Sequence, residues 1–266
     1  MQEDEYDPNI DMALVQKELA ASAFRDSLIY LDSVASTMDI AHSEASSSTI
    51  RRLVILAEEQ TAGRGRFKRD WISPKYQNLY LSILMPGTEN ILRYMSIAAC
   101  LATSKAIEGL TSLKVDINWP NDLTVAGKKL AGILVEQVHA SDNLSYGVIG
   151  IGININMDTN LYPEIAQIAT SIRQEMGHPL SRELVLIELL KMIEEQETNI
   201  RADHTPVLEW KRRLVTLGRR ITLTEAQASH TGKAVDVDEA GNLVMELDDK
   251  SYITLASGDV TSQLLP

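Results

Sequence analysis

The chain alternates short apolar runs with segments in which apolar residues recur every three or four positions. This pattern is typical of a domain that mixes strands and helices. Runs that predict strands lie at residues 28–31, 53–57, 78–85, 115–119, 123–125, 129–137 and 146–156. Helical spacing predicts helices at residues 11–24, 92–110, 182–199 and 207–213, and a further one that begins at Met38 after Ser36-Thr37. The sequence therefore predicts an α+β fold, with helices packed on a mixed β-sheet.

After Leu217-Gly218 the pattern changes to short strand-like runs without helical spacing. These runs lie at residues 220–224, 233–237, 243–247 and 252–255, with turns at 240–242 and 248–249. Closely spaced short strands without a helix predict a small barrel. We expect one domain over residues 1–215, in which residues 1–27 form an extension with a short helix, and an all-β domain over residues 216–266.

Composition narrows the classes of function. The chain has 266 residues, 44% hydrophobic content and a formal net charge of −12. General nucleic-acid binding calls for a broad basic face, which an acidic chain does not offer. No secretory leader and no apolar run of membrane-spanning length is visible, and the single cysteine, Cys100, predicts a buried thiol in a reducing compartment. We therefore expect a cytoplasmic protein without a nucleic-acid or membrane partner.

Several common kinds of active site are absent from the sequence. The histidines lie far apart, with no spacing that would gather them around a metal. No G-x-S-x-G nucleophile motif and no P-loop spacing occur. The segment Gly150-Ile-Gly152 has two of the three glycines of a dinucleotide-binding fingerprint but continues as a strand. Its glycines instead allow a ligand or a neighbouring backbone to approach closely.

The first candidate for function is the loop from Gln60 to Trp71. Between Gln60 and Lys75 the chain carries five basic residues and one acidic residue. Such a concentration of positive charge favours an anionic partner. Gly63 and Gly65 alternate with the arginines and let the backbone fold closely around a ligand. The loop therefore predicts an anion-binding site.

A second polar group follows at Asn118-Trp119-Pro120-Asn121-Asp122, one hairpin before Lys129. Pro120 fixes the turn, so that Asn121 and Asp122 can leave the sheet. Lys129 begins a strand that becomes fully apolar, which places a cation at the mouth of a buried strand. A lysine there can stabilise developing negative charge, and a nearby carboxylate can hold Mg²⁺ together with phosphates. We expect chemistry on a nucleotide phosphate beside an apolar pocket.

These residues resemble the motifs of the biotin–protein ligases in order and spacing. The matching segments are Gly63–Trp71, Trp119–Asp122, Lys129–Glu136 and Gly150–Asn154, with Ser36-Thr37, Gln60 and Asn78–Ser82 as further matches. The end of the chain resembles the small SH3-like barrel of that family at Gly232–Asp238, Gly241–Leu243 and Ser257–Val260. The resemblance covers roughly residues 28–262. It implies a class II synthetase-like catalytic domain followed by that barrel.

The resemblance also implies a reaction. The carboxylate of biotin attacks the α-phosphate of ATP, and a lysine of a carrier domain then attacks the resulting biotinyl-5′-adenylate. The implied cofactors are biotin, ATP and Mg²⁺. The implied partner is a biotin carboxyl carrier protein or domain of a biotin-dependent carboxylase.

By position, the resemblance implies roles for particular residues. The residues expected to bind biotin or the nucleotide are Ser36, Thr37, Met38, Gln60, Gly63, Arg64, Gly65, Arg66, Arg69, Trp71, Asn121, Lys129, Gly132 and Asn154. Lys129, Arg66 and Asp122 are the expected catalytic residues. Among them, Lys129 stabilises the carboxylate and the pentavalent phosphate, and Asp122 is the expected metal ligand.

Two positions depart from the family pattern. Asn118 stands where the family usually has lysine, and Met38 where asparagine more often follows Ser-Thr. About 27 residues precede the start of the resemblance, so we expect a monofunctional ligase without the DNA-binding domain of the family's repressors. The alternative is a lipoate or octanoate ligase of the same fold. A homodimer and a monomer both agree with the sequence.

Overall fold

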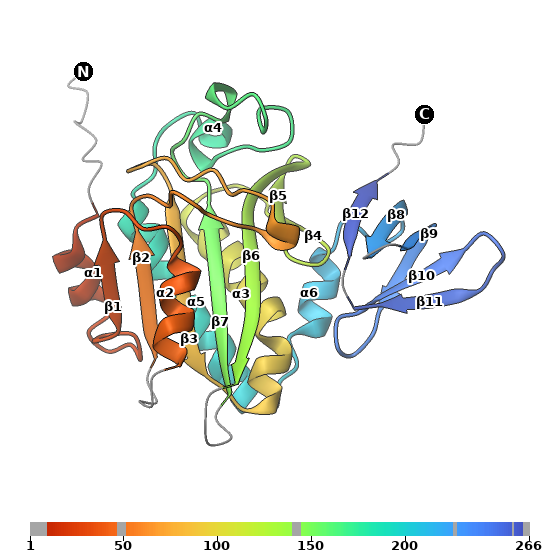
Figure 1. Ribbon diagram of the computed structural model, residues 1–266, viewed down its shortest axis with the longest axis horizontal. Coiled ribbons are helices and arrows are strands. Elements are labelled where there is room, and N and C mark those ends of the chain that lie inside the picture. The colour runs from red at the N-terminus through yellow and green to blue at the C-terminus, as the bar shows by residue number, and fades with distance from the viewer. Residues whose placement is uncertain (1–9, 47–51, 140–144, 226–227, 257, 263–266) are drawn as a thin grey trace.

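A computed structural model of the chain describes residues 10–46, 52–139, 145–225, 228–256 and 258–262. A seven-stranded sheet forms the centre of the larger body, and a five-stranded sheet lies beside it (Figure 1). The order across the larger sheet is β1 (Leu28–Leu31), β2 (Leu53–Ala57), β3 (Leu79–Pro86), β7 (Ser145–Ile153), β6 (Lys128–His139), β5 (Asp122–Val125) and β4 (Asp116–Asn118). Strands β1 and β2 pair in parallel and the remaining neighbours are antiparallel, so the predicted mixed sheet is confirmed.

Helices pack on both faces of this sheet. The α-helices of the described residues are α1 (Met12–Glu18), α2 (Thr37–Ala45), α3 (Glu89–Leu110), α4 (Ile172–Met176), α5 (Arg182–Arg201) and α6 (Val207–Arg213). Helices α3 and α5 pack together on one face, and α2 lies on the other (Figure 1). Along β2, Val54 and Leu56 belong to the larger apolar core, whereas Leu53 and Ile55 belong to the cluster under α2. Every residue of β2 is buried because both faces of the strand are covered.

The predicted elements are present, with two instructive differences. The helix predicted over residues 11–24 ends at Glu18, and the chain then forms turns. The carboxylate of Glu194 on α5 accepts hydrogen bonds from the Ser22 hydroxyl at 2.6 Å and from the Ala23 N–H at 3.1 Å. This contact from 171 residues away redirects the chain, so that Phe24 is fully buried. Helix α4 was not predicted, because its five residues are too short to show helical periodicity.

A buried ion pair joins β2 to the start of α5. Arg182 and Glu58 are 2% and 1% exposed, and their Nη1 and Oε2 atoms lie 2.5 Å apart. Arg182 also donates to the carbonyl of Asn78 at 3.1 Å, and Tyr30 donates its hydroxyl to Glu58. Burial, with the contact to Glu58, raises the pKa of Tyr30 above its ordinary value. Each charge is therefore neutralised and hydrogen-bonded, as burial of an ion requires.

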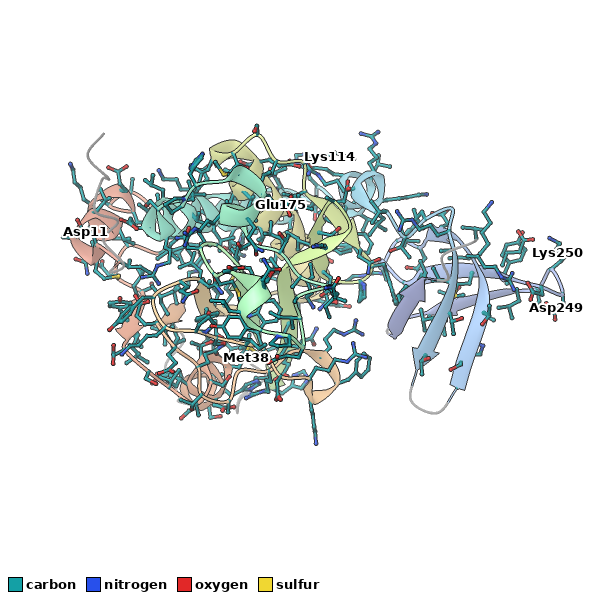
Figure 2. The ribbon with its side chains drawn as sticks, turned by 90° about the horizontal axis from the view of Figure 1, so that it is seen from above. Asp11, Met38, Lys114, Glu175, Asp249 and Lys250 are labelled. Carbon is teal, nitrogen blue, oxygen red and sulfur yellow. The ribbon has the colours of Figure 1, made fainter. Side chains whose placement is uncertain are left out.

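The C-terminal sheet is entirely antiparallel. Its spatial order is β11 (Tyr252–Leu255), β10 (Leu243–Leu247), β9 (Ala228–Val237), β8 (Arg220–Glu225) and β12 (Asp259–Ser262). The predicted all-β C-terminal part is confirmed, and β12 is an additional strand that the pattern did not reveal. Figure 2 shows Asp249 and Lys250 at the far tip of this sheet, while Met38 lies in the larger body. The division at residue 215 remains a prediction, since α6 ends at Arg213 and β8 begins only at Arg220.

The two sheets share one apolar core. Trp119 and Trp210 are each 1% exposed. The turn at Gly241 lies so close to them that an added β-carbon would meet Ile97 at 2.7 Å and Trp210 at 3.5 Å. Buried residues of both sheets form a single contiguous cluster. The barrel is therefore attached by core packing as well as by the chain that leads into it.

Two expectations from composition concern Cys100 and the membrane. Cys100 is completely buried on α3, as predicted, and burial raises the pKa of its thiol. Over the residues described above, no helix has both the length and the apolar character needed to cross a bilayer.

We predict that Arg182→Met lowers the free energy of unfolding by about 3–5 kcal/mol, because Glu58 is left as an unpaired buried charge. Arg201→Met is the matched control. Arg201 pairs with Glu197 but is 49% exposed, so its loss is expected to cost about 1 kcal/mol or less. Urea unfolding followed by circular dichroism measures both variants. Equal stability of the two would contradict a dominant role for the buried pair.

Candidate functional site

The arginine-rich loop folds back on itself as a small hairpin. The Trp71 N–H donates to the Gly63 carbonyl at 2.9 Å, and the Gly65 N–H donates to the Arg69 carbonyl at 2.8 Å. A turn of 3₁₀ helix over Arg66–Lys68 forms its tip, where Phe67 and Lys68 have positive φ angles of 56° and 58°. Left-handed conformations are unfavourable for such side chains and occur preferentially at functional sites. Backbone hydrogen bonds and a 3₁₀ turn thus give this loop a defined path.

Two arginines of this hairpin are held by other segments. Arg64 forms an ion pair with Asp39 of α2, with Nη1 and Oδ1 2.7 Å apart. Arg66 donates to the side-chain oxygen of Asn121 at 3.2 Å, and its guanidinium carbon lies 4.9 Å from the centre of the Phe67 ring. The positive charge of the loop is therefore spread over several partners instead of being left to repel itself.

The second polar group lies opposite the hairpin, on the turn between β4 and β5. The Lys129 amine and the Asp122 carboxylate are 2.8 Å apart, and each side chain is about one-third exposed. Asn121 is 7% exposed and donates its amide to the Ile133 carbonyl, which fixes the oxygen that Arg66 contacts. The tight turn at Ala126-Gly127, with φ angles of 49° and 80°, returns the chain into β6 and brings Lys129 beside Asp122.

Glycines form the floor between these groups. Gly132 of β6 faces Gly152 of β7 in the antiparallel register, and the Trp71 ring lies across both. A β-carbon at Gly152 would lie 2.5–2.7 Å from atoms of that ring, and one at Gly132 would lie 3.0 Å away. At Gly150 the nearest atom would be the Met38 sulfur, at 2.8 Å. A ligand or a neighbouring backbone was expected to approach closely at Gly150 and Gly152, whereas in the structure the side chains of Met38 and Trp71 do so.

The other wall comes from the start of α2 and the end of β2. The Thr37 backbone N–H and hydroxyl both donate to Gln60 Oε1, at 2.9 and 3.1 Å, and the Thr37 hydroxyl contacts that of Ser82 at 2.8 Å. The Ser36 hydroxyl and the Trp71 indole N–H are buried and have no hydrogen-bond partner within the described part of the chain. Unpaired buried polar groups are costly, and both border the same hollow. They are suited to bind a polar ligand that enters there.

Together these walls enclose a cavity of about 480 Å³. The site residues predicted from sequence that line it are Ser36, Thr37, Met38, Gln60, Arg64, Gly65, Arg66, Arg69, Trp71, Asn121, Asp122, Lys129, Gly132 and Asn154. Gly63 lies behind the hairpin, where a β-carbon would meet the Trp71 carbonyl at 2.7 Å and the Ser73 hydroxyl at 2.8 Å. It shapes the loop and is not among the residues that border the cavity in the described segments.

Some lining residues were not assigned to the site from sequence. Phe67, Ile165 and Ile168 add apolar surface, and Phe67 and Ile168 are 53% and 64% exposed. Gly258 and Val260 reach the cavity from the C-terminal sheet. Gly258 and Val260 lie in the motif Ser257–Val260, which is one of the segments that resemble the biotin–protein ligases. Nothing in the local sequence, however, showed that this motif contacts the catalytic domain.

Comparison with known proteins agrees with this architecture. The model of the biotin/lipoate A/B protein ligase family matches residues 30–154, and that of the biotin protein ligase C-terminal domain matches residues 216–261. The bifunctional ligase/repressor BirA of Bacillus subtilis is 31% identical over 84% of this chain and 70% of its own length. A biotin–[acetyl-CoA-carboxylase] ligase of Mycobacterium tuberculosis is 27% identical over 95% of this chain and 96% of its own.

A solved structure gives the same result. The biotin protein ligase from Aquifex aeolicus in complex with biotin and ATP superposes with a TM-score of 0.76 at 28% identity, covering 90% of this chain and 99% of that one. The chain belongs to the biotin/lipoate A/B protein ligase family. The C-terminal domain and the named relatives place it among the biotin protein ligases, and a lipoate or octanoate ligase is the less supported alternative.

We predict that Gly152→Ala displaces the Trp71 ring, because the new methyl group would overlap it. Intrinsic fluorescence should shift to longer wavelength, since the other two tryptophans remain buried. Gly109→Ala on α3 is the control, because the nearest atom to its new methyl group would be 4.0 Å away. An unchanged spectrum in Gly152→Ala would contradict the position of the indole on the glycine floor.

Proposed function

We propose that the chain joins biotin to a specific lysine of a biotin carboxyl carrier domain in two steps at this cavity. In the first step the biotin carboxylate attacks the α-phosphate of ATP, giving biotinyl-5′-AMP and pyrophosphate. In the second, the amine of the carrier lysine attacks the acyl carbon, an amide forms and AMP leaves. Two relatives support this proposal, since those of Mycobacterium tuberculosis and Paracoccus denitrificans are biotin–[acetyl-CoA-carboxylase] ligases.

The observation that carries the proposal is the arrangement of two polar pairs beside an apolar floor. Arg66–Asn121 and Lys129–Asp122 both border the cavity, where the successive residues Asn121 and Asp122 hold the two cations, and the floor beside them is glycine covered by Trp71. Arg66 and Lys129 are the cations we propose for the charge that develops as the carboxylate meets the phosphate. Positive groups already held in place need little reorganisation when the reaction occurs.

The opposite end of the cavity suits the ring system of biotin. The Ser36 hydroxyl, the Thr37–Gln60 group and the Gly132 backbone offer donors and acceptors around a narrow, mostly apolar space. Trp71 and Met38 now cover the glycines there, and we propose that the ligand contacts these two side chains. Shielding by the Trp71 hairpin would protect a mixed anhydride from water until the carrier lysine arrives. Asn154, 3% exposed, is proposed to face the nucleotide.

Mg²⁺ is proposed to enter with the nucleotide, which it assists by neutralising phosphate charge. The part of the chain that the structure describes has no group of three or more His, Cys, Asp or Glu side chains able to hold a metal ion. This donor set fits Mg²⁺, which typically takes one or two carboxylates and fills the rest of its shell with phosphate and water. Asp122, beside Lys129 at the cavity, is the carboxylate we propose for it.

Two further proposals concern partners. In the described residues, β6 pairs with β5 only as far as Gly132, so that residues 134–139 present a free strand edge on that side. This edge supports self-association by strand pairing, and we propose a homodimer. Analytical ultracentrifugation, which measures the mass in solution, would test it.

The net charge of −12 supports the proposal that duplex DNA is not a partner of these residues. The single, buried cysteine, Cys100, supports the proposal that the protein acts in the reducing cytoplasm.

We predict that labelled biotin is transferred to a biotin carboxyl carrier domain only when ATP and Mg²⁺ are both present. Lipoate and octanoate, supplied in place of biotin, should not drive pyrophosphate release. A carrier domain whose target lysine is replaced by arginine is the control for the second step. Pyrophosphate release with lipoate but not with biotin would reverse the choice between the two ligases.

We further predict that Lys129→Ala slows biotin-dependent pyrophosphate release by roughly two to three decades, since one fixed charge contact is worth about 3–4 kcal/mol. Lys128→Ala is the control, because Lys128 is the adjacent lysine and is exposed to solvent. The circular dichroism spectra of both variants should match that of the parent protein. Release at the parent rate in Lys129→Ala would remove this lysine from the reaction.

A further inference from the structure

The segment that leads into the C-terminal sheet is part of the larger sheet. Leu214 forms a parallel bridge with Ile117 of β4, and the Val215 N–H donates to the Ile117 carbonyl at 3.0 Å. Residues 214–215 thus continue the sheet beyond its edge strand. The C-terminal part is therefore attached in fixed register to the strand that leads into the turn bearing Asn121 and Asp122.

The next residue, Thr216, makes a polar contact at this edge. Its hydroxyl is buried, accepts the backbone N–H of Trp119 at 2.9 Å and donates to the side-chain oxygen of Asn118 at 2.9 Å. One hydroxyl thus provides a hydrogen-bond partner for two groups on the successive residues Asn118 and Trp119, which lead into the turn at the cavity. A lysine at position 118 could not take part in the same way, because an ammonium group has no acceptor atom.

Trp119 is also held from the other side. Its indole N–H donates to the carbonyl of Gly241 at 3.0 Å, in a turn of the C-terminal sheet. Gly241 has a φ of 83°, which glycine adopts readily, and a β-carbon there would lie only 2.7 Å from Ile97, so this turn packs closely against the core. Trp119 is separated from Asn121 by Pro120 alone, and Asn121 accepts the hydrogen bond of Arg66. The next residue, Asp122, pairs with Lys129.

We propose that Thr216 and Asn118 are positioning residues for the activation of the nucleotide. Their hydrogen bonds fix the main chain at residues 117–119, and through it the two polar pairs at the cavity. Neither residue needs to touch a reacting atom for this role. The inference rests on the proposed function, because it takes those pairs as the groups that bind and activate ATP.

The test compares Thr216→Val, Thr216→Ser and Thr222→Val. Valine keeps the shape of threonine but leaves the Trp119 N–H buried without its acceptor, whereas serine keeps the hydroxyl. Thr222→Val is the control for loss of a threonine hydroxyl, since the Thr222 hydroxyl makes one partly buried bond, with Thr231 at 2.9 Å, inside the C-terminal sheet. Steady-state pyrophosphate release gives the KM values for ATP and biotin, and hydrogen exchange of the ligand-free protein reports the Trp119 amide.

Thr216→Val should raise the KM for ATP about tenfold and leave that for biotin within about twofold, because losing the acceptor of a buried N–H has an effect of this order. Exchange of the Trp119 amide should accelerate in this variant alone, and Thr216→Ser should restore both properties. If Thr216→Val does not fold, Asn118→Ala carries the same test with a smaller expected effect, since Trp119 keeps its acceptor.

Unchanged exchange at Trp119 in Thr216→Val would overturn the proposed attachment. Faster exchange with an unchanged KM for ATP would overturn the positioning role and leave a purely structural bond. Equal rises of the KM for ATP in Thr216→Val and Thr222→Val would also overturn it. A parent protein that releases no pyrophosphate with biotin would instead overturn the proposed function, while the exchange experiment would still decide whether Thr216 fixes the segment.

Discussion

The site depends on the absence of side chains at Gly132 and Gly152. These residues face each other across β6 and β7, and the Trp71 ring lies directly on their backbone. A β-carbon at Gly152 would overlap the ring, and one at Gly132 would press on it, so that the ring and the end of the hairpin that begins at Gly63 would have to shift. The same hairpin carries Arg66, which contacts Asn121. The geometry of the charged groups is thus set by an apolar contact, and this explains why glycines recur in a buried strand where they would otherwise weaken it.

The cations that border the cavity have acidic partners within the protein, and a ligand can take the place of these partners. An anion-binding site in a protein of net charge −12 has many acidic groups nearby, and some serve as partners for its cations. Asp39 pairs with Arg64, and Asp122 pairs with Lys129. Both pairs are partly exposed, so each is worth little and can be exchanged at small cost for a phosphate or a carboxylate of a ligand. The fully buried pair of Glu58 and Arg182 is different in kind, because it has no solvent to replace a lost partner and serves the fold.

Much of the fold and of the site could be predicted from sequence, because the information was local. Short apolar runs indicated the strands, and the motifs at Gly63–Trp71 and Trp119–Asp122 stood at turns where side chains could leave the sheet. Contacts between distant segments could not be predicted in this way. Glu194 ends the first helix early, the hairpin buries Gly63 behind Trp71, and Gly258 and Val260 border a cavity in the other domain. Each of these depends on tertiary packing, which periodicity does not describe.

The same distinction explains why the two parts of the chain are easy to separate in sequence but not in structure. A change from mixed elements to short strands suggests an independent barrel after residue 215. In space, however, Trp119 is buried against the Gly241 turn, and Thr216 bonds to the strand before it. A segment can leave the sheet and still hold side chains accurately only if its main chain is fixed at both ends. For Asn121 and Asp122, β5 supplies one end, and the C-terminal part supplies the other. The barrel therefore forms part of the support of the site, which gives a physical reason for the two parts to occur together in one chain.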